Sequence, residues 1–148
     1  MFAHALVAVD GSAQSDYALS LFLKTIDAKR TKVTVLYVIA PSRYVVAEEA
    51  LRYSGTPSLH RLQERLVQQE EESVRSRVKM ISEDESVPVE MIVRIGDPRD
   101  EILAAAEEVD ASLIVMGSTG KGLGERILLG SVSTYVTVHS PISTMIIR

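Results

Sequence analysis

The chain has 148 residues, 46% of them hydrophobic, which suits one domain with a buried core. The chain is too short for two independent domains, each with its own core. Its net charge of −4 does not provide the basic surface that non-specific nucleic-acid binding requires. The chain has no cysteine, which excludes disulfides, thiolate nucleophiles and thiolate metal sites among these residues.

The N-terminal region has no basic stretch, and its apolar run at residues 5–9 is far shorter than the ~20 residues of a membrane span. We therefore expect no signal peptide, no membrane association and a cytoplasmic location.

The first elements alternate between strand and helix. Residues 5–9 are continuously apolar and are followed by Asp10, Gly11 and Ser12, a pattern typical of a strand buried on both faces. Ser12 is a suitable N-cap for a helix, and residues 32–39 are β-branched and apolar, which predicts a second strand. Apolar residues at helical spacing after Ser12 are Tyr17, Ala18, Leu21, Phe22 and Ile26.

Residues 42–57 show no period, and we expect a mobile loop there. The next helix is long, and a further strand is predicted at residues 87–95. Asp97 and Pro98 then predict a capped helix start. The chain then continues with a buried strand at 113–116, a glycine-rich stretch, a short helix at 131–139 and a strand at 144–147. The apolar face expected for the long helix contains Leu59, Leu62, Leu66, Val74, Val78 and Ile81.

This alternation predicts a single α/β domain over residues 1–148, with an open parallel five-stranded sheet and helices on both faces. Ligands of such sheets bind beyond the carboxyl ends of the strands, near the point where the strand order reverses. Three predicted strands end at residues 9–11, 38–40 and 116–117, so their ends are the expected walls of a site.

The segment 117–133 contains five glycines between positions 117 and 130. Glycine lets backbone amides approach an anion closely, and the helix that follows Gly130 offers its N-terminus to negative charge. The hydroxyls of Ser131 and Ser133 add donors, and Lys121 and Arg126 add positive charge. Glycine content alone is equally compatible with a flexible connection between strand and helix.

The spacing excludes two common nucleotide motifs. No Gly-x-x-x-x-Gly-Lys-[Ser/Thr] sequence occurs, so the segment is not a P-loop. Glu125 stands where the third glycine of a dinucleotide-binding fingerprint would be needed.

Gly117-x2-Gly120, nine residues and then Gly130-Ser131 resembles the nucleotide-binding pattern of ATP-binding universal stress proteins, Gly-x2-Gly-x9-Gly-[Ser/Thr]. The resemblance extends over the whole chain. It includes the segments 7–12 and 96–98, with Ile102 and Ala105, and the C-terminal residues 145–148. It is weakest over residues 41–60.

The resemblance implies the strand order 3-2-1-4-5 and an adenine nucleotide as ligand, namely ATP, alone or with Mg²⁺. Asp10 would contact the ribose or lie near a phosphate-bound metal, Val9 and Val38 would line the adenine pocket, and Met116 would pack near the nucleoside. The phosphates would be held by Gly117, Gly120, Gly130, Ser131, Val132 and Ser133.

Each of these residues also has a purely structural interpretation. Asp10 can cap the first helix, Val38 and Met116 can be core residues, and Ser131 can be an N-cap. The implied function is that of a regulatory nucleotide-binding protein of the stress response. The alternatives are a slow ATP hydrolase or phosphotransferase on the same site, and a dimeric scaffold without nucleotide.

The last predicted strand, Thr144 to Ile147, is short, apolar and expected at a sheet edge, which invites pairing with another chain. The resemblance implies a homodimer through this strand. The three histidines have no metal-ligand spacing, and with only two Phe and five Tyr no basic aromatic patch for RNA is formed.

Overall fold

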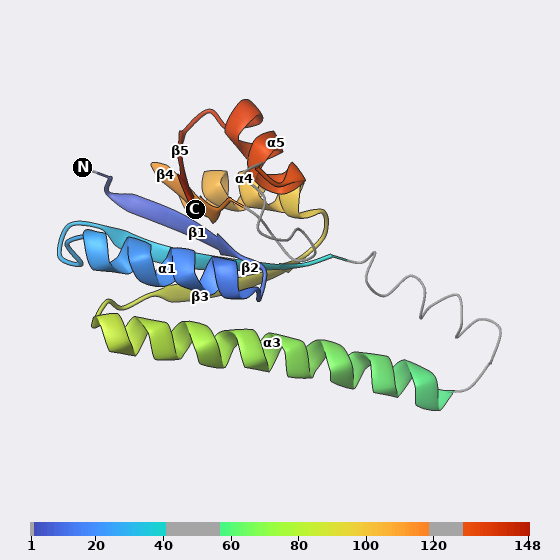
Figure 1. The fold of residues 1–148 in the computed structure, drawn as a ribbon. Helices are drawn as coiled ribbons and strands as arrows, with labels where there is room; N and C mark the ends of the chain where they lie inside the picture. The colour runs from blue at the N-terminus through green and yellow to red at the C-terminus, as the bar shows by residue number, and fades with distance from the viewer. Residues whose placement is uncertain (1, 41–56, 119–128) are drawn as a thin grey trace.

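The computed structural model describes residues 2–40, 57–118 and 129–148 (Figure 1). Their elements alternate as the sequence predicts. In chain order they are β1 (His4–Val9), α1 (Ala13–Thr25), β2 (Lys32–Ile39), α3 (Pro57–Glu85), β3 (Glu90–Ile95), α4 (Pro98–Glu108), β4 (Leu113–Gly117), α5 (Ser131–His139) and β5 (Ser143–Ile147).

The five strands form one parallel sheet in the order β3-β2-β1-β4-β5, which confirms the predicted topology. The chain moves outward from β1 to β3 and then crosses back to β4 on the other side of β1. The reversal of strand order therefore lies between β1 and β4, where ligands of open parallel sheets bind.

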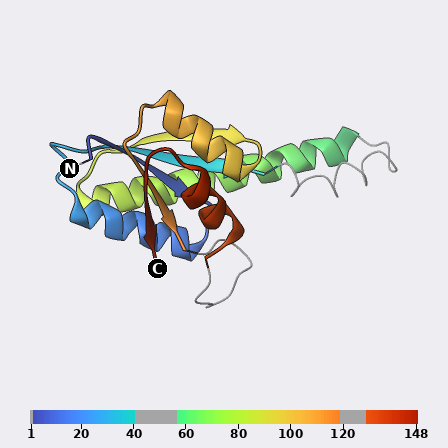
Figure 2. The ribbon, with the colours of Figure 1, turned by 90° about the horizontal axis from the view of Figure 1, so that it is seen from above.

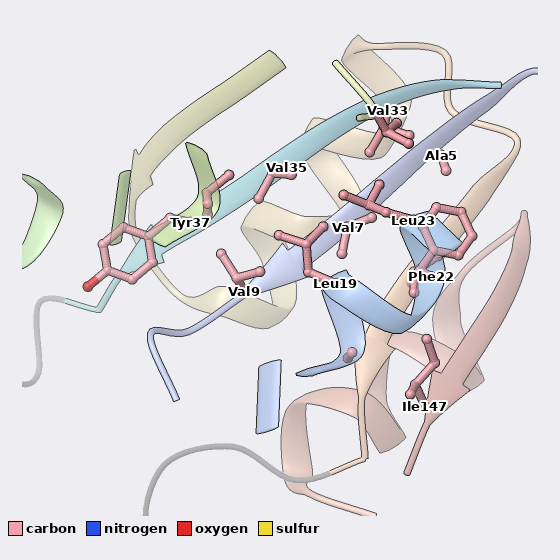
Figure 3. Close-up of a cluster of buried hydrophobic side chains, with 14 of the residues drawn as sticks. Ala5, Val7, Val9, Leu19, Phe22, Leu23, Val33, Val35, Tyr37 and Ile147 are labelled. Atoms are coloured by element: carbon pink, nitrogen blue, oxygen red, sulfur yellow. The ribbon is translucent and has the colours of Figure 1, made fainter. Parts of the chain in front are cut away.

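Strand residues alternate between two hydrophobic cores, because successive side chains point to opposite faces of a sheet. Val7 and Val35 lie on the face covered by α1 and α3, whereas Leu6 and Leu36 lie on the face covered by α4 and α5. All four are completely buried. Figure 3 shows the first core, which includes Leu19, Phe22 and Leu23 of α1, a helix that packs against β1 and β4. Burial on both faces explains why the strands read as continuous apolar runs.

The predicted start of α1 is confirmed, but its buried face is rotated relative to the expected one. Ser12 is the N-cap, and its hydroxyl accepts the amide of Ser15. Tyr17 is 53% exposed and Leu21 lies at the surface, so these members of the apolar pattern do not reach the core. The buried residues of α1 are Ser15, Ala18, Leu19, Phe22 and Leu23.

The apolar face expected for the long helix is wrong in its N-terminal half. Val74 and Val78 of α3 are buried against the sheet, whereas Leu62 and Leu66 are 52% and 54% exposed. The reason is length. The 29 residues of α3 span about 44 Å, and the 13 residues of α1 beside it span about 20 Å. The first turns of α3 therefore extend beyond α1 and the sheet (Figures 1 and 2).

The remaining boundaries shift by small amounts. β3 begins at Glu90 rather than at residue 87, because Ser86 has a φ of 56° and Val87 is tied to the end of α3 through Ser82. The expected loop ends one residue early, because Pro57 already belongs to α3, and its other residues lie outside the described ones. Within the described part of the chain, no helix is both long and apolar enough to cross a bilayer.

Candidate functional site

The turn between β1 and α1 is held by hydrogen bonds within a few residues. The amide of Ser12 donates to Asp10 Oδ1 at 2.9 Å, and the amide of Asp10 donates to Ser15 Oγ at 3.2 Å. Gly11 allows this turn because its φ is +80°, a region that other residues rarely adopt. Asp10 lies at the carboxyl end of the central strand β1 and fixes the turn through the amide of Ser12, while the N-cap of α1 is Ser12 and not Asp10.

The two described ends of the glycine segment meet beside this turn, at the end of β4. The carbonyl of Ser118 accepts the amide of Gly130 at 2.7 Å. The hydroxyl of Ser133, which is buried, donates to Gly130 O at 3.0 Å and lies 3.3 Å from Ser118 O. These bonds join the end of β4 to the start of α5 and close the two described ends of the glycine segment on each other. Ser133 uses its hydroxyl in this closure, and Gly117 is the last residue of β4.

The start of α5 differs from the starts of α1 and α4. Ser12 and Asp97 each place a side-chain oxygen on an amide of the helix that they cap. Gly130 caps α5 with no side-chain hydrogen bond, and its φ of −66° needs no glycine. The amides of Ser131, Val132 and Ser133 form the first turn, which has no carbonyl partner within the helix. Acceptors for these amides must therefore come from outside the helix.

The predicted nucleoside residues lie on both faces of the sheet. Val9 is 4% exposed in the core under α1 and α3 (Figure 3), and Met116 is 4% exposed in the core under α4 and α5. Val38 is half-buried on the α4 and α5 face. The side chains of Val9 and Met116 thus belong to the two hydrophobic cores. At the carboxyl edge of the sheet, mainly the backbone of these two residues is accessible.

A further contact joins the glycine segment to α1. The carbonyl of Ile147, at the end of β5, accepts the amide of Ser118 at 2.9 Å and Gln14 Nε2 at 3.2 Å. The sequence placed Ser118 within the glycine segment but predicted neither its contact with Ile147 nor a part for Gln14 in this region. The only available signal was the position of Ser118 inside the spaced glycine motif.

Gly120, Lys121 and Arg126 lie outside the described residues, as do the other glycines between Gly120 and Gly130. Among residues 2–40, 57–118 and 129–148, no group of three or more His, Asp or Glu residues is arranged to hold a metal ion.

One carboxylate at the carboxyl edge has a shifted pKa. The side-chain hydrogen bond from Arg99, followed by the Arg99 backbone amide, lowers the pKa of Asp97. Asp97 follows β3 and caps α4, so it lies at the outer strand, away from the reversal between β1 and β4. Its charge stabilises the start of α4.

Known proteins with similar sequences support a common origin. The model of the universal stress protein family matches residues 1–148. A universal stress protein of Methanothermobacter thermautotrophicus is 41% identical over 85 residues, 56% of this chain and 58% of that protein. A putative universal stress protein of Staphylococcus aureus is 28% identical over 144 residues, 97% of this chain and 82% of that protein.

Solved structures share the fold. The hypothetical protein MJ0577, the subject of a structure-based assignment of biochemical function, superposes with a TM-score of 0.78 at 27% identity, over 99% of this chain and 96% of that one. A universal stress protein in complex with cAMP gives 0.61 at 24% identity, over 99% and 97%. An Arabidopsis thaliana family member with AMP bound gives 0.61 at 19% identity, over 97% and 90%. With the family model matching its whole length, this chain belongs to the universal stress protein family.

Proposed function

We propose that this protein binds an adenine nucleotide, with the phosphates at the first turn of α5 and the nucleoside toward β1 and β2. The observation that carries the proposal is the contact of Ser118 with Gly130, the two described ends of the glycine segment, beside a helix start that has no side-chain cap. Backbone amides at such a start, together with the helix dipole, favour an anion. The reversal of strand order between β1 and β4 is where this type of sheet binds its ligands.

The spaced glycine pattern and the family favour ATP, alone or with Mg²⁺, in a regulatory protein of the stress response. Asp10 would contact the ribose or a phosphate-bound metal, and Val38 would offer backbone groups to the base. Gly117, Gly120, Gly130 and the first turn of α5 would contact the phosphates. The two universal stress proteins solved with cAMP and AMP support an adenine nucleotide as the ligand class.

The decisive measurement is calorimetric titration with ATP and Mg²⁺, with adenosine as a second ligand. Ser131→Asp is the informative variant, because Ser131 is exposed and a carboxylate there would compete with phosphate for the first turn of α5. We expect this variant to bind ATP at least tenfold more weakly and adenosine almost unchanged. Met80→Asp is the control, because it adds the same charge at a position of α3 that is 59% exposed and lies outside both α5 and β5.

A wild-type protein that shows neither heat nor a thermal shift with ATP would contradict the proposal and would favour a scaffold without nucleotide. Equal loss of ATP affinity in both variants would show a general charge effect instead of a phosphate site at α5. Phosphate release in the same samples would detect the alternative of a slow hydrolase.

The proposal includes a homodimer through β5, which occupies one edge of the sheet. Met145 in this strand is 37% exposed, and Val138 lies exposed on the neighbouring helix α5. Apolar side chains beside a strand at a sheet edge favour pairing with the same strand of a second chain.

A further inference from the structure

One peptide group in the β1–α1 turn is held at both of its ends by charged side chains. Its N–H, from Ser12, donates to Asp10 Oδ1 at 2.9 Å. Its C=O, from Gly11, accepts Arg77 Nη2 at 2.7 Å. Because a peptide unit is planar, a group that fixes the carbonyl also fixes the direction of the N–H. The guanidinium of Arg77 is thus connected to the carboxylate of Asp10 through a single rigid plane.

Arg77 comes from α3, which lies beside α1 on the same face of the sheet (Figure 1). Its guanidinium is held by two further contacts, Nε to Asp16 Oδ2 at 2.9 Å and Nη1 to Ser73 Oγ at 3.1 Å. Asp16 lies in the first turn of α1, and its side chain is 22% exposed. Arg77 therefore binds both the turn that carries Asp10 and the helix that follows it, and its position is not that of a free surface arginine.

The glycine at position 11 makes this contact consequential. With a φ of +80° and no side chain, Gly11 has more backbone freedom than any other residue would have, so its peptide can rotate unless a partner holds it. A charged donor on the carbonyl also polarises the peptide and strengthens the hydrogen bond that its N–H makes. Loss of Arg77 would leave the Asp10 carboxylate with a less well fixed donor.

The geometry points to Arg77 as a positioning residue for the nucleotide site, acting through the Gly11–Ser12 peptide on Asp10. This inference rests on the proposed function, since Asp10 is the carboxylate that would meet the ribose or its metal. The inference assigns to the nucleotide site a residue, Arg77, that lies outside both the glycine motif and the ends of the strands. It also makes α3 a support of the site and not only a cover of the sheet.

The test compares Arg77→Ala with Arg75→Ala. Arg75 lies on the same helix and pairs with Glu71 at the surface, so its removal costs the same charge without touching the turn. We expect Arg77→Ala to bind ATP and adenosine about tenfold more weakly, which corresponds to about 1.4 kcal/mol, and Arg75→Ala to match the wild type. Arg77→Lys, which keeps the charge but not the forked donors, should recover only part of the affinity.

A double-mutant cycle with Asp10→Ala separates positioning from other effects. If Arg77 acts through Asp10, Arg77→Ala should change the affinity less than twofold in the Asp10→Ala background. A tenfold loss that persists in that background would overturn the inference, and so would an unchanged affinity of Arg77→Ala alone. A loss that grows with the number of phosphates and falls with salt would assign Arg77 a direct charge effect, which also contradicts it.

Hydrogen exchange of the Ser12 amide tests the same geometry without any ligand. We expect faster exchange of this amide in Arg77→Ala than in Arg75→Ala, with the amide of Val7 in the core unchanged. Equal exchange of Ser12 in both variants would overturn the inference even if the protein binds nucleotide. If the amide of Ser12 exchanges faster in Arg77→Ala but the wild-type protein binds no nucleotide, the contact between Arg77 and the turn is supported. Its role in nucleotide binding is then contradicted.

Discussion

Gly11 is the residue whose backbone conformation matters most in the β1–α1 turn. Its φ of +80° directs the carbonyl to Arg77 and the following amide to Asp10. Gly130 has a φ of −66° and serves the site differently, by leaving the first turn of α5 without a side chain. Gly11 and Gly130 thus differ in what they contribute, Gly11 through its backbone conformation and Gly130 through its missing side chain.

We expect Gly11→Ala to lower the free energy of unfolding by about 1–2 kcal/mol, because a Cβ is strained at positive φ. Urea denaturation would measure this loss. Gly11→Asn should lose less, because asparagine adopts positive φ more readily than alanine. An alanine variant as stable as the wild type would show that the turn can relax to negative φ.

At the scale of elements, the two halves of α3 differ in how deeply their apolar side chains are buried. Its C-terminal half packs on the sheet through Val74 and Val78, while Leu62 and Leu66 remain about half exposed. The apolar pattern of this helix in the sequence did not distinguish the two halves. Only the shorter length of α1 and of the sheet beside it determines where burial ends.

The two halves of α3 should therefore respond differently to truncated side chains. Val78→Ala removes buried methyl groups, and we expect it to lower the free energy of unfolding by about 2 kcal/mol. Leu66→Ala should change it by no more than about 0.5 kcal/mol, because Leu66 is 54% exposed. Chemical denaturation of both variants checks the difference, and similar losses would mean that the first turns of α3 are covered in solution.

At the scale of the whole molecule, the sheet has two outer strands with different surfaces. β3 bears Glu90 and Arg94, which pair with Lys32 and Glu108. The residues of β5, from Ser143 to Ile147, carry no charge. Charged residues protect an edge from pairing with other chains, so β5 is the better candidate for contact with a second copy.

We expect the wild-type protein to be a dimer at micromolar concentration and Met145→Lys to be a monomer, as measured by light scattering. A lysine on an edge strand would bring like charges together across a two-fold axis and oppose pairing. Met80→Lys, at a position of α3 that is 59% exposed, is the matched control and should stay dimeric. A monomeric wild type, or a dimer that survives in Met145→Lys, would contradict the assignment to β5.

The sequence by itself determined the order of elements, the parallel sheet, the caps at Ser12 and Asp97, and the start of the last helix after Gly130. These features depend on periods and contacts within a few residues, so they can be inferred locally. The glycine spacing also led to the family, which the whole-chain match supports.

Only the tertiary structure decided which distant groups meet. Arg77 lies 66 residues from Gly11, and Gln14 lies 133 residues from Ile147. These contacts depend on the position of each helix along the axis of the elements packed against it. The periodicity of side chains in the sequence does not encode that position. For the same reason the sequence predicted that α1 and α3 each have a buried apolar face. It did not predict which residues of α1 form that face or where along α3 the face ends, because the elements packed against a helix decide which of its side chains are buried.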